Sequence, residues 1–491
     1  MDKRSKYAAL IGMGAALASL PVRAALYRPE KVNGGTLPDE QVDLERYRKN
    51  LSDAIRIKTI ASDDAEKTDW APFDEFHELL RERYPLIHEK LELKEFGRGS
   101  LLFRWHGSDP SLDPIALLAH QDVVPVSEGT EDDWEHPAFE GHDDGEFIWG
   151  RGALDMKNHL IAVMEAVEDL LAEGFAPVRD VYLCLGHNEE VMCSVDNGAV
   201  IMCNYFEEQG IHLDCIIDEG GAILPVNIGG VIHKNLAGIG VAEKGYADFE
   251  VAVTAKGGHS SQSPNHTAIG KLADVIKDIE NHQFKAELTP MMMELFDKIG
   301  RNCSFPVRMV TCNIKLLKPL IKKAMTYIPP AASMIRTTTG VTMASGSPAP
   351  NVLPQRASVN VNFRIFPGET VEDVEKHLRK VIRNKNVEIS LRPGWKNPSK
   401  ISPRDSRCFK ALEEICVSMD PDNIVAPYLV MGGTDACHYE AVCENIYRYS
   451  PFPVSTALLL TVHGTNERIP IASMAVGVAF FKRYVRRLSL P

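Results

Sequence analysis

Four short apolar runs in this chain lead directly into histidine or acidic residues. Such runs are typical of buried parallel strands. In open α/β sheets, the carboxyl ends of the strands meet at the edge where ligands bind. The pattern therefore predicts an α/β fold whose mostly parallel sheet gathers side chains suited to a transition metal at one edge. The runs are 115–119 before His120 and Asp122, 181–185 before Glu189 and Glu190, 215–217 before Asp218 and Glu219, and 458–462 before His463.

A fifth candidate ligand, Asp155, follows the turn sequence 149–154 and precedes a helical pattern of apolar residues that ends at Gly174. A glycine just after the last apolar position is a common helix terminator. Asp155 is therefore expected near the start of this helix, where free backbone N–H groups and the helix dipole favour a carboxylate.

Length and charge narrow the class of protein. The chain has 491 residues and a formal net charge of −13. That length predicts more than one domain. Phosphate binding needs a basic surface, so the acidic balance argues against a nucleic-acid partner. The ten cysteines include no C-x-x-C pair and no pattern of a disulfide framework, which favours a reducing environment.

The N-terminus points the other way. Lys3, Arg4 and Lys6 precede an apolar run at 7–20, which Pro21 ends. This form is typical of a signal sequence, with cleavage near 22–24, although the run is short for a transmembrane helix. Two interpretations of residues 1–26 stay open. They are a signal or membrane anchor, which implies export or membrane tethering, or a structural helix of a cytoplasmic protein.

The order of elements predicts an interrupted catalytic domain. Strands and helices alternate between 75 and 240, which favours βαβ units. A second module follows, with an alternating strand pattern at 358–365 and a helical pattern at 370–381. We therefore expect a catalytic domain in two parts, 27–239 and 396–491, and an inserted α+β domain at 240–395.

Five side chains are candidate metal ligands. One zinc ion takes four ligands, so five protein ligands suit two ions that share a carboxylate. We expect Asp155 to be shared, so that each ion also has one histidine and one further carboxylate. Asp122 is expected behind the metal, accepting the N–H of His120 and fixing its orientation. The five candidates are His120, Asp155, Glu190, Asp218 and His463.

Glu189 and Glu190 are adjacent, so in extended backbone their side chains point in opposite directions. One can bind metal while the other faces the attacking water. We assign Glu190 to the metal and Glu189 to general-base catalysis, in which a carboxylate accepts the proton of the water and later delivers it to the leaving amine.

Six motifs together resemble the co-catalytic zinc amidohydrolases. That family includes aminoacylase, glutamate carboxypeptidase, the succinyl-diaminopimelate desuccinylases and carboxypeptidase S. The chain is most similar to carboxypeptidase S and the secreted N-acyl-amino-acid hydrolases, over about residues 45–485 in order. The motifs are the segments 118–126, 150–157, 189–191, 218–221, 257–261 and 433–435.

The resemblance implies two zinc ions per subunit, with cobalt or manganese able to replace zinc. It also implies that the inserted domain is a lid and a homodimerisation surface. His259 would stabilise the oxyanion, often across the dimer. Asn351, Arg364 and Gly433 would help to bind substrate, and the arginine would favour a carboxylate.

The implied activity is hydrolysis of an amide bond by a metal-activated water, in an exopeptidase of the carboxypeptidase type or an N-acyl-amino-acid deacylase. The substrate would be a small peptide or an N-acyl amino acid. A biosynthetic deacylase and an inactive protein that kept the fold for ligand binding are the alternatives.

Two features depart from the family pattern. Relatives commonly have glycines after Glu-Glu-Val, where this chain has Met192-Cys193-Ser194. Many also have a basic residue at the position of Cys437, which puts one contact to a substrate carboxylate in doubt; His438 is a candidate substitute. Neither departure removes a candidate ligand, so we expect an active enzyme.

Overall fold

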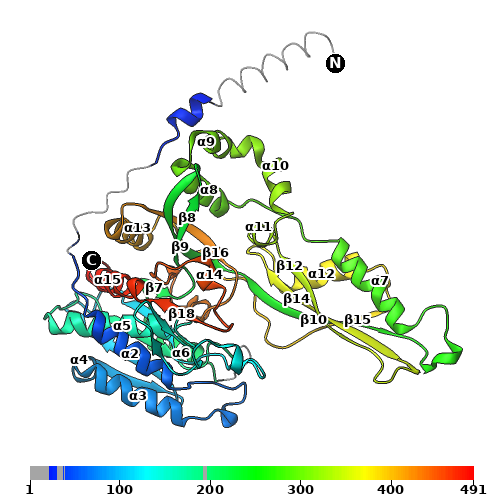
Figure 1. Cartoon of the computed structure of the whole chain (residues 1–491), viewed down its shortest axis with the longest axis horizontal. Helices are drawn as coiled ribbons and strands as arrows, with labels where there is room; N and C mark the ends of the chain where they lie inside the picture. Colours follow the sequence, from blue (N-terminus) through cyan, green and yellow to red (C-terminus); the bar gives the residue numbers. More distant parts are fainter. Residues whose placement is uncertain (1–20, 30–36, 38, 192–195, 491) are drawn as a thin grey trace, which may run out of the picture.

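The computed structural model describes residues 21–29, 37, 39–191 and 196–490, which form a large sheet, a four-stranded sheet and two smaller sheets with their helices (Figure 1). The apolar run at 7–20 and the departure at Met192-Cys193-Ser194 lie outside the described residues. Within these ranges, no helix is long and apolar enough to cross a bilayer.

The large sheet has the strand order β1-β2-β6-β3-β7-β17-β9-β16, and β8 pairs with β9. Its centre, β6-β3-β7-β17, is parallel, and so is the pair β9–β16. The remaining pairings are antiparallel. The strands are β1 (Glu92–Phe96), β2 (Ser100–Trp105), β3 (Ile115–His120), β6 (Val181–Gly186), β7 (Cys215–Asp218), β8 (Ile223–Ile228), β9 (Ile232–Glu243), β16 (Asn423–Val430) and β17 (Ile446–Arg448).

Helices cover both faces of this sheet, as the uninterrupted apolar runs predicted. Alternate residues of one strand enter different cores: Leu117 belongs to the core that includes residues of α2, α5, α13 and α15, whereas Leu118 belongs to the core that includes residues of α6. The helices around the sheet are α2 (Leu44–Arg56), α3 (Ala71–Arg83), α4 (Pro85–Lys90), α5 (Lys157–Ala172), α6 (Gly198–Glu208), α13 (Arg407–Met419) and α15 (Ile471–Leu488).

The run 458–462 is not a strand, and this prediction was wrong. Residues Thr456–Leu459 form the short helix α14, whose first turn is capped by the Ser455 side chain accepting from the Leu458 N–H. Leu460 is 80% exposed. The run therefore belongs to a surface turn, and His463 follows it with a positive φ of 60°. Next along the chain, β18 (Arg468–Pro470) joins β4 (His142–Asp143) and β5 (Phe147–Trp149) in a small sheet.

The second sheet, with the order β12-β14-β10-β15, is antiparallel and projects to one side of the large sheet (Figure 1). Helices α7 and α12 pack on it around Phe249 and Phe363. We call this sheet, its two helices and the separate two-stranded β11–β13 ladder the lid. Its elements are β10 (Gly245–Thr254), β11 (Gly258–His259), α7 (Ala268–Asn281), β12 (Thr338–Ser345), β13 (Val352–Leu353), β14 (Arg356–Ile365), α12 (Val371–Val381) and β15 (Val387–Leu391).

Between the lid elements α7 and β12, the chain forms a helical segment that packs against the large sheet. Met292 and Leu295 of this segment pack with Ala426 of β16, although the segment lies inside the expected insert, 240–395. The β9 strand also continues to Glu243, and a bridge between Tyr246 and Lys396 closes the base of the lid. The segment comprises α8 (Pro290–Asn302), α9 (Phe305–Thr311), α10 (Ile314–Met325) and α11 (Pro329–Ser333).

Candidate metal centre

The carboxylate of Asp155 lies between two histidines. Its Oδ1 atom is 3.2 Å from Nε2 of His120, and its Oδ2 atom is 3.0 Å from Nε2 of His463. His120 ends β3, Asp155 precedes α5 by two residues, and His463 follows α14. Three segments far apart in sequence thus direct ring nitrogens to opposite oxygens of one carboxylate, which is the arrangement of a ligand shared by two ions.

Each histidine also faces a second carboxylate. His463 Nε2 is 3.1 Å from Oε1 of Glu190, and His120 Nε2 is 3.3 Å from Oε1 of Glu219. Glu219 was not among the expected ligands. Glu189 belongs to the same cluster, because its carboxylate lies within 4.8 Å of ligand atoms of His120 and Glu219.

Asp218, an expected ligand, does not point to this cluster. Its Oδ1 accepts from the Glu219 N–H at 2.8 Å, and its Oδ2 accepts from the Ala436 N–H at 2.8 Å. The strand β7 continues through Asp218, so successive side chains leave opposite faces and the next residue is the one that faces His120. Asp218 therefore holds two backbone segments together, and Glu219 takes its place in the cluster.

Asp122 lies behind His120 and orders two further residues. The Nδ1 atom of His120 is 2.9 Å from the backbone oxygen of Asp122 and 3.3 Å from its carboxylate. The same carboxylate accepts from the N–H groups of Glu189 and Glu190, each at 3.1 Å. One buried side chain thus fixes the end of β6 relative to the end of β3, and an acceptor at Nδ1 leaves Nε2 free to bind a metal.

The charges of this cluster fit bound cations. Burial raises the pKa of the Glu189, Glu190 and Glu219 carboxyls above the ordinary glutamate value. Hydrogen bonds to Asp155 and Glu190 raise the pKa of His463 to about 10. Buried carboxylates that gather around two imidazoles favour any positive charge among them. The donor set, two histidines with several carboxylates, suits zinc and similar divalent metals.

Glu467 anchors the loop that carries Asp155, a role that sequence reasoning missed. Its carboxylate is fully buried, pairs with Arg151 Nη1 at 2.7 Å, and accepts from the N–H groups of Gly152, Leu154 and Asp155 at 3.0, 2.8 and 3.1 Å. The partners lie more than 300 residues apart in sequence, so no local pattern could have indicated them.

A cavity of about 500 Å³ opens beside the cluster. Asp155, Glu219 and His463 line one end. The rest of its wall is mainly apolar and draws on both the large sheet and the helical segment. The apolar lining includes Leu224, Leu236, Leu295, Met334, Val454 and Leu459.

The lid residues expected at the site are not brought to it within one chain. His259 is exposed, and its Nδ1 lies 2.8 Å from Ser261 Oγ. It pairs with Val352 in the β11–β13 ladder, next to Asn351, whose carbonyl accepts from the Ser260 N–H at 3.0 Å. Arg364 lies over the ring of Tyr246, 4.9 Å from its centroid. Among the described residues that line the cavity, none of these three occurs.

Gly433 does line the cavity, and Lys396 lies against it. A Cβ atom at Gly433 would collide with the Lys396 Nζ. That ammonium lies 3.5 Å from Cys437 Sγ and 3.6 Å from Glu243 Oε2. Burial raises the pKa of Cys437 to about 12, so its thiol is neutral. Lys396 therefore places a positive charge beside Cys437, where the family resemblance led us to expect a basic residue.

Ligands of this kind beside a cavity fit the chemistry of metal-dependent hydrolases, and the chain belongs to that class. The chain belongs to peptidase family M20/M25/M40, whose family model matches residues 116–487. The resemblance drawn from the motifs is thereby confirmed.

Individual proteins agree with this assignment. "Probable carboxypeptidase S-like 2" of Dictyostelium discoideum is 36% identical over 90% of this chain and 85% of its own length. The mouse "N-fatty-acyl-amino acid synthase/hydrolase PM20D1" is 32% identical over 96% of this chain and 97% of its own. An M20 family metallo-carboxypeptidase from Sulfolobus solfataricus shares the fold, with a TM-score of 0.66 at 21% identity, covering 91% of this chain and 99% of that chain.

The different positions of Asp218 and Glu219 can be tested by metal binding. Glu219→Ala should lower the zinc bound per chain, because a side chain facing His120 is lost. Asp218→Asn should keep the zinc but lower the free energy of unfolding by about 1–3 kcal/mol, because one buried backbone N–H loses its acceptor. Zinc content at a fixed, chelator-buffered zinc concentration and urea denaturation measure the two effects. The reverse pattern of zinc loss would contradict the geometry described here.

Proposed function

We propose that this protein is a dizinc hydrolase that cleaves the amide bond of N-acyl amino acids. The observation that carries the proposal is the Asp155 carboxylate, which offers one oxygen toward each histidine. In this proposal one ion takes His120, Asp155 and Glu219, and the other takes His463, Asp155 and Glu190. The ions would polarise the scissile carbonyl and lower the pKa of a water molecule.

The chain's own residues would then orient the reactants and move one proton. Glu189 lies beside His120 and Glu219 and holds no position in the proposed ligand set, so it is the candidate general base. Its backbone N–H is fixed by Asp122, which limits the movement of the carboxylate. Glu189 would accept the proton of the attacking water and deliver it to the nitrogen of the leaving amino acid.

Glu189→Gln separates this role from metal binding. The carboxamide is nearly the same shape but cannot accept the proton, so turnover should fall by about two to four orders of magnitude. Zinc content should equal that of the parent protein, because no proposed ligand is removed. Near-normal turnover in a metal-replete Glu189→Gln protein would exclude Glu189 as the base.

The apolar cavity favours an acyl substrate over a peptide with polar side chains. Burial of hydrocarbon in water-free space contributes about 0.8 kcal/mol per CH₂ group, and the wall formed by Leu224, Leu295 and Met334 offers such space. The mouse relative is named as an N-fatty-acyl-amino acid synthase/hydrolase. We therefore place the acyl chain in this cavity and the amino-acid part on the side of Lys396. Carboxypeptidase activity on peptides with an apolar penultimate residue is the second candidate.

Lys396 would bind the substrate carboxylate. The catalytic end of the cavity is strongly acidic. The negative charge of a substrate carboxylate therefore needs a nearby cation to offset the repulsion. The Lys396 side chain is 32% exposed and adjoins Gly433 on the cavity wall. Glu243 lies 3.6 Å from the Lys396 Nζ and also pairs with Arg448 Nε at 2.6 Å. Arg448 is buried and Lys396 is partly exposed, so Lys396 is the cation more available to substrate.

Lys396→Met tests this assignment with a pair of substrates. An N-acyl amino acid and its carboxamide analogue differ only in the negative charge, so the preference for the free acid, measured as the ratio of kcat/KM values, should fall at least about tenfold, as expected for a charged hydrogen bond. Lys400→Met is the matched control, because Lys400 is exposed and bonds the Glu440 backbone oxygen at 3.5 Å. An unchanged acid-to-amide ratio in Lys396→Met would exclude the contact.

His259, Asn351 and Arg364 would act on substrate only in an assembled homodimer or after closure of the lid. His259 and Asn351 lie side by side on an exposed edge of the lid, which suits a contribution to a neighbouring subunit. The imidazole of His259 would stabilise the oxyanion there.

Mixing two inactive variants tests whether His259 acts in the site of a partner subunit. Glu189→Gln and His259→Ala should each have little activity alone. After random exchange half of the dimers are mixed, and each mixed dimer has one site with both required groups, so about a quarter of all sites should recover. If subunit exchange is demonstrated and no activity returns, His259 does not act across a dimer.

A further inference from the structure

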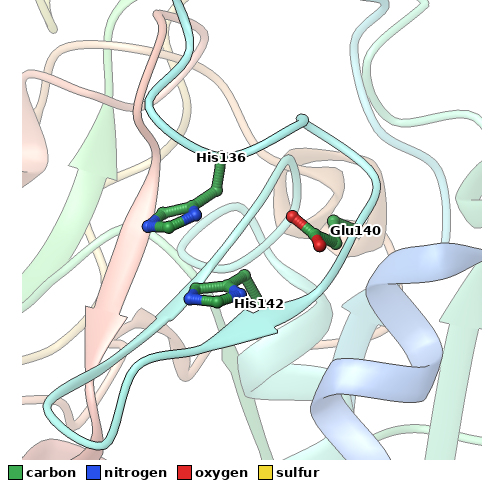
Figure 2. Close-up of side chains that lie close together, drawn as sticks. All are labelled: His136, Glu140 and His142. Carbon is green, nitrogen blue, oxygen red and sulfur yellow. The ribbon is translucent and has the colours of Figure 1, made fainter.

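Three ligand-type side chains lie together in a second place, apart from the residues of the catalytic cluster. They are His136, Glu140 and His142, and one ligand atom of each lies within 4.8 Å of the others. Figure 2 shows the two imidazoles stacked and the Glu140 carboxylate facing them. The ring centroids are 3.8 Å apart and the ring planes differ by 15°. All three side chains are at least partly exposed, so an ion can reach them from solvent.

We propose that His136, Glu140 and His142 bind one divalent transition-metal ion, best suited to zinc, as a site separate from the catalytic centre. Two imidazoles and one carboxylate are a common zinc donor set, with water as the fourth ligand. Ligand atoms around one tetrahedral zinc lie about 3.3 Å apart. Since the three ligand atoms already lie within 4.8 Å of one another, they need to approach by at most about 1.5 Å, a movement open to partly exposed side chains.

The backbone that carries these ligands is already fixed. The carbonyl of Glu140 accepts from Arg56 Nε at 2.9 Å, and the carbonyl of Gly141 accepts from the Ser52 hydroxyl. Asp143, next to His142, pairs with Arg48 through two bonds of 3.0 Å. Because helix α2 supplies all three anchors, binding an ion would order side chains rather than the main chain, which lowers the entropy cost of binding.

Trp149 and the small sheet hold the two rings in place. The His136 ring contacts the Trp149 ring at a centroid distance of 5.0 Å and an angle of 66°. His142 lies opposite Trp149 in the β4–β5 ladder. The Trp149 ring lies on one side of the cluster. The polar groups that remain available to an ion are the ring nitrogens and the Glu140 carboxylate.

The surrounding charge favours a cation. Residues 128–146 contain nine aspartates and glutamates and no lysine or arginine. Arg48, Arg56 and Arg468 lie against this segment and offset part of its charge, and the remaining acidic excess attracts divalent cations and repels anions such as phosphate. The same excess makes a metal a better occupant than an anionic peptide or nucleotide.

The test compares zinc binding by the intact enzyme and by His136→Asn/His142→Asn. In equilibrium dialysis against buffered zinc, the parent protein should bind one more equivalent per chain than the double variant. Glu140→Gln should bind this equivalent more weakly. Since the comparison is a difference between variants, it does not depend on how many ions the catalytic centre holds.

The matched control is His106→Asn/His212→Asn. These histidines are also exposed and each lies near one carboxylate, at 3.2 Å from Glu92 and 3.7 Å from Asp113. The control should bind as much zinc as the parent. Equal binding by the parent and His136→Asn/His142→Asn, or an equal loss in the control, would overturn the proposal.

A second measurement separates this site from the catalytic one. Hydrolase activity of His136→Asn/His142→Asn should match the parent, which also shows that the variant is folded. Adding zinc beyond catalytic saturation should raise the Tm of the parent but not of the double variant, because only the parent gains a ligand of the folded state. Loss of activity together with the zinc equivalent would instead assign these residues to the catalytic centre and contradict a separate site.

Discussion

The repulsion among buried carboxylates at one edge of the large sheet is the constraint on which the rest of the site depends. Asp155, Glu189, Glu190 and Glu219 share a space in which two unit charges 4 Å apart interact by about 4 kcal/mol at an effective dielectric constant of 20. Protonation of a carboxylate or a bound cation relieves this cost. The fold therefore has to hold the acidic side chains in position before any cation binds.

Fixed backbone supplies that support. Asp122 accepts from two consecutive N–H groups at the end of β6, Asp218 joins β7 to the 434–436 segment, and Glu467 accepts from three N–H groups around Asp155. Each of these three carboxylates accepts hydrogen bonds from backbone N–H groups, and none of them is a proposed metal ligand. A second group of acids thus positions the first, and the preorganised geometry is rigid because the supporting bonds are buried.

Sequence reasoning predicted the elements whose apolar pattern is unambiguous. The buried runs that became β3, β6 and β7, the alternation that became β14 and the helix α12 lie within a few residues of their expected bounds. It failed where one residue decides the direction of a side chain, as at Asp218 and Glu219. It also failed at 458–462, where Ser455 caps a helix that an apolar run alone does not indicate.

Contacts between distant segments could not be predicted from the sequence. Lys396 meets Cys437 across 41 residues, and Glu467 meets Gly152 across 315. Neither pair has a local signature, because a lysine or glutamate in a loop is ordinarily solvated. The expected bases and ligands came from motifs, whereas the residues that hold those motifs in place became visible only in three dimensions.

The helical segment α8–α11 lines one side of the cavity and can vary without changing the rest of the fold. It starts and ends at the same place, since the Glu287 N–H bonds the Ile335 carbonyl at 2.6 Å, yet it contributes Leu295 and Met334 to the lining. A segment whose ends meet can be lengthened, shortened or replaced without moving the strands on either side. A change confined to this segment can thus alter the volume of the cavity, while every side chain of the candidate metal centre stays on the framework that holds it.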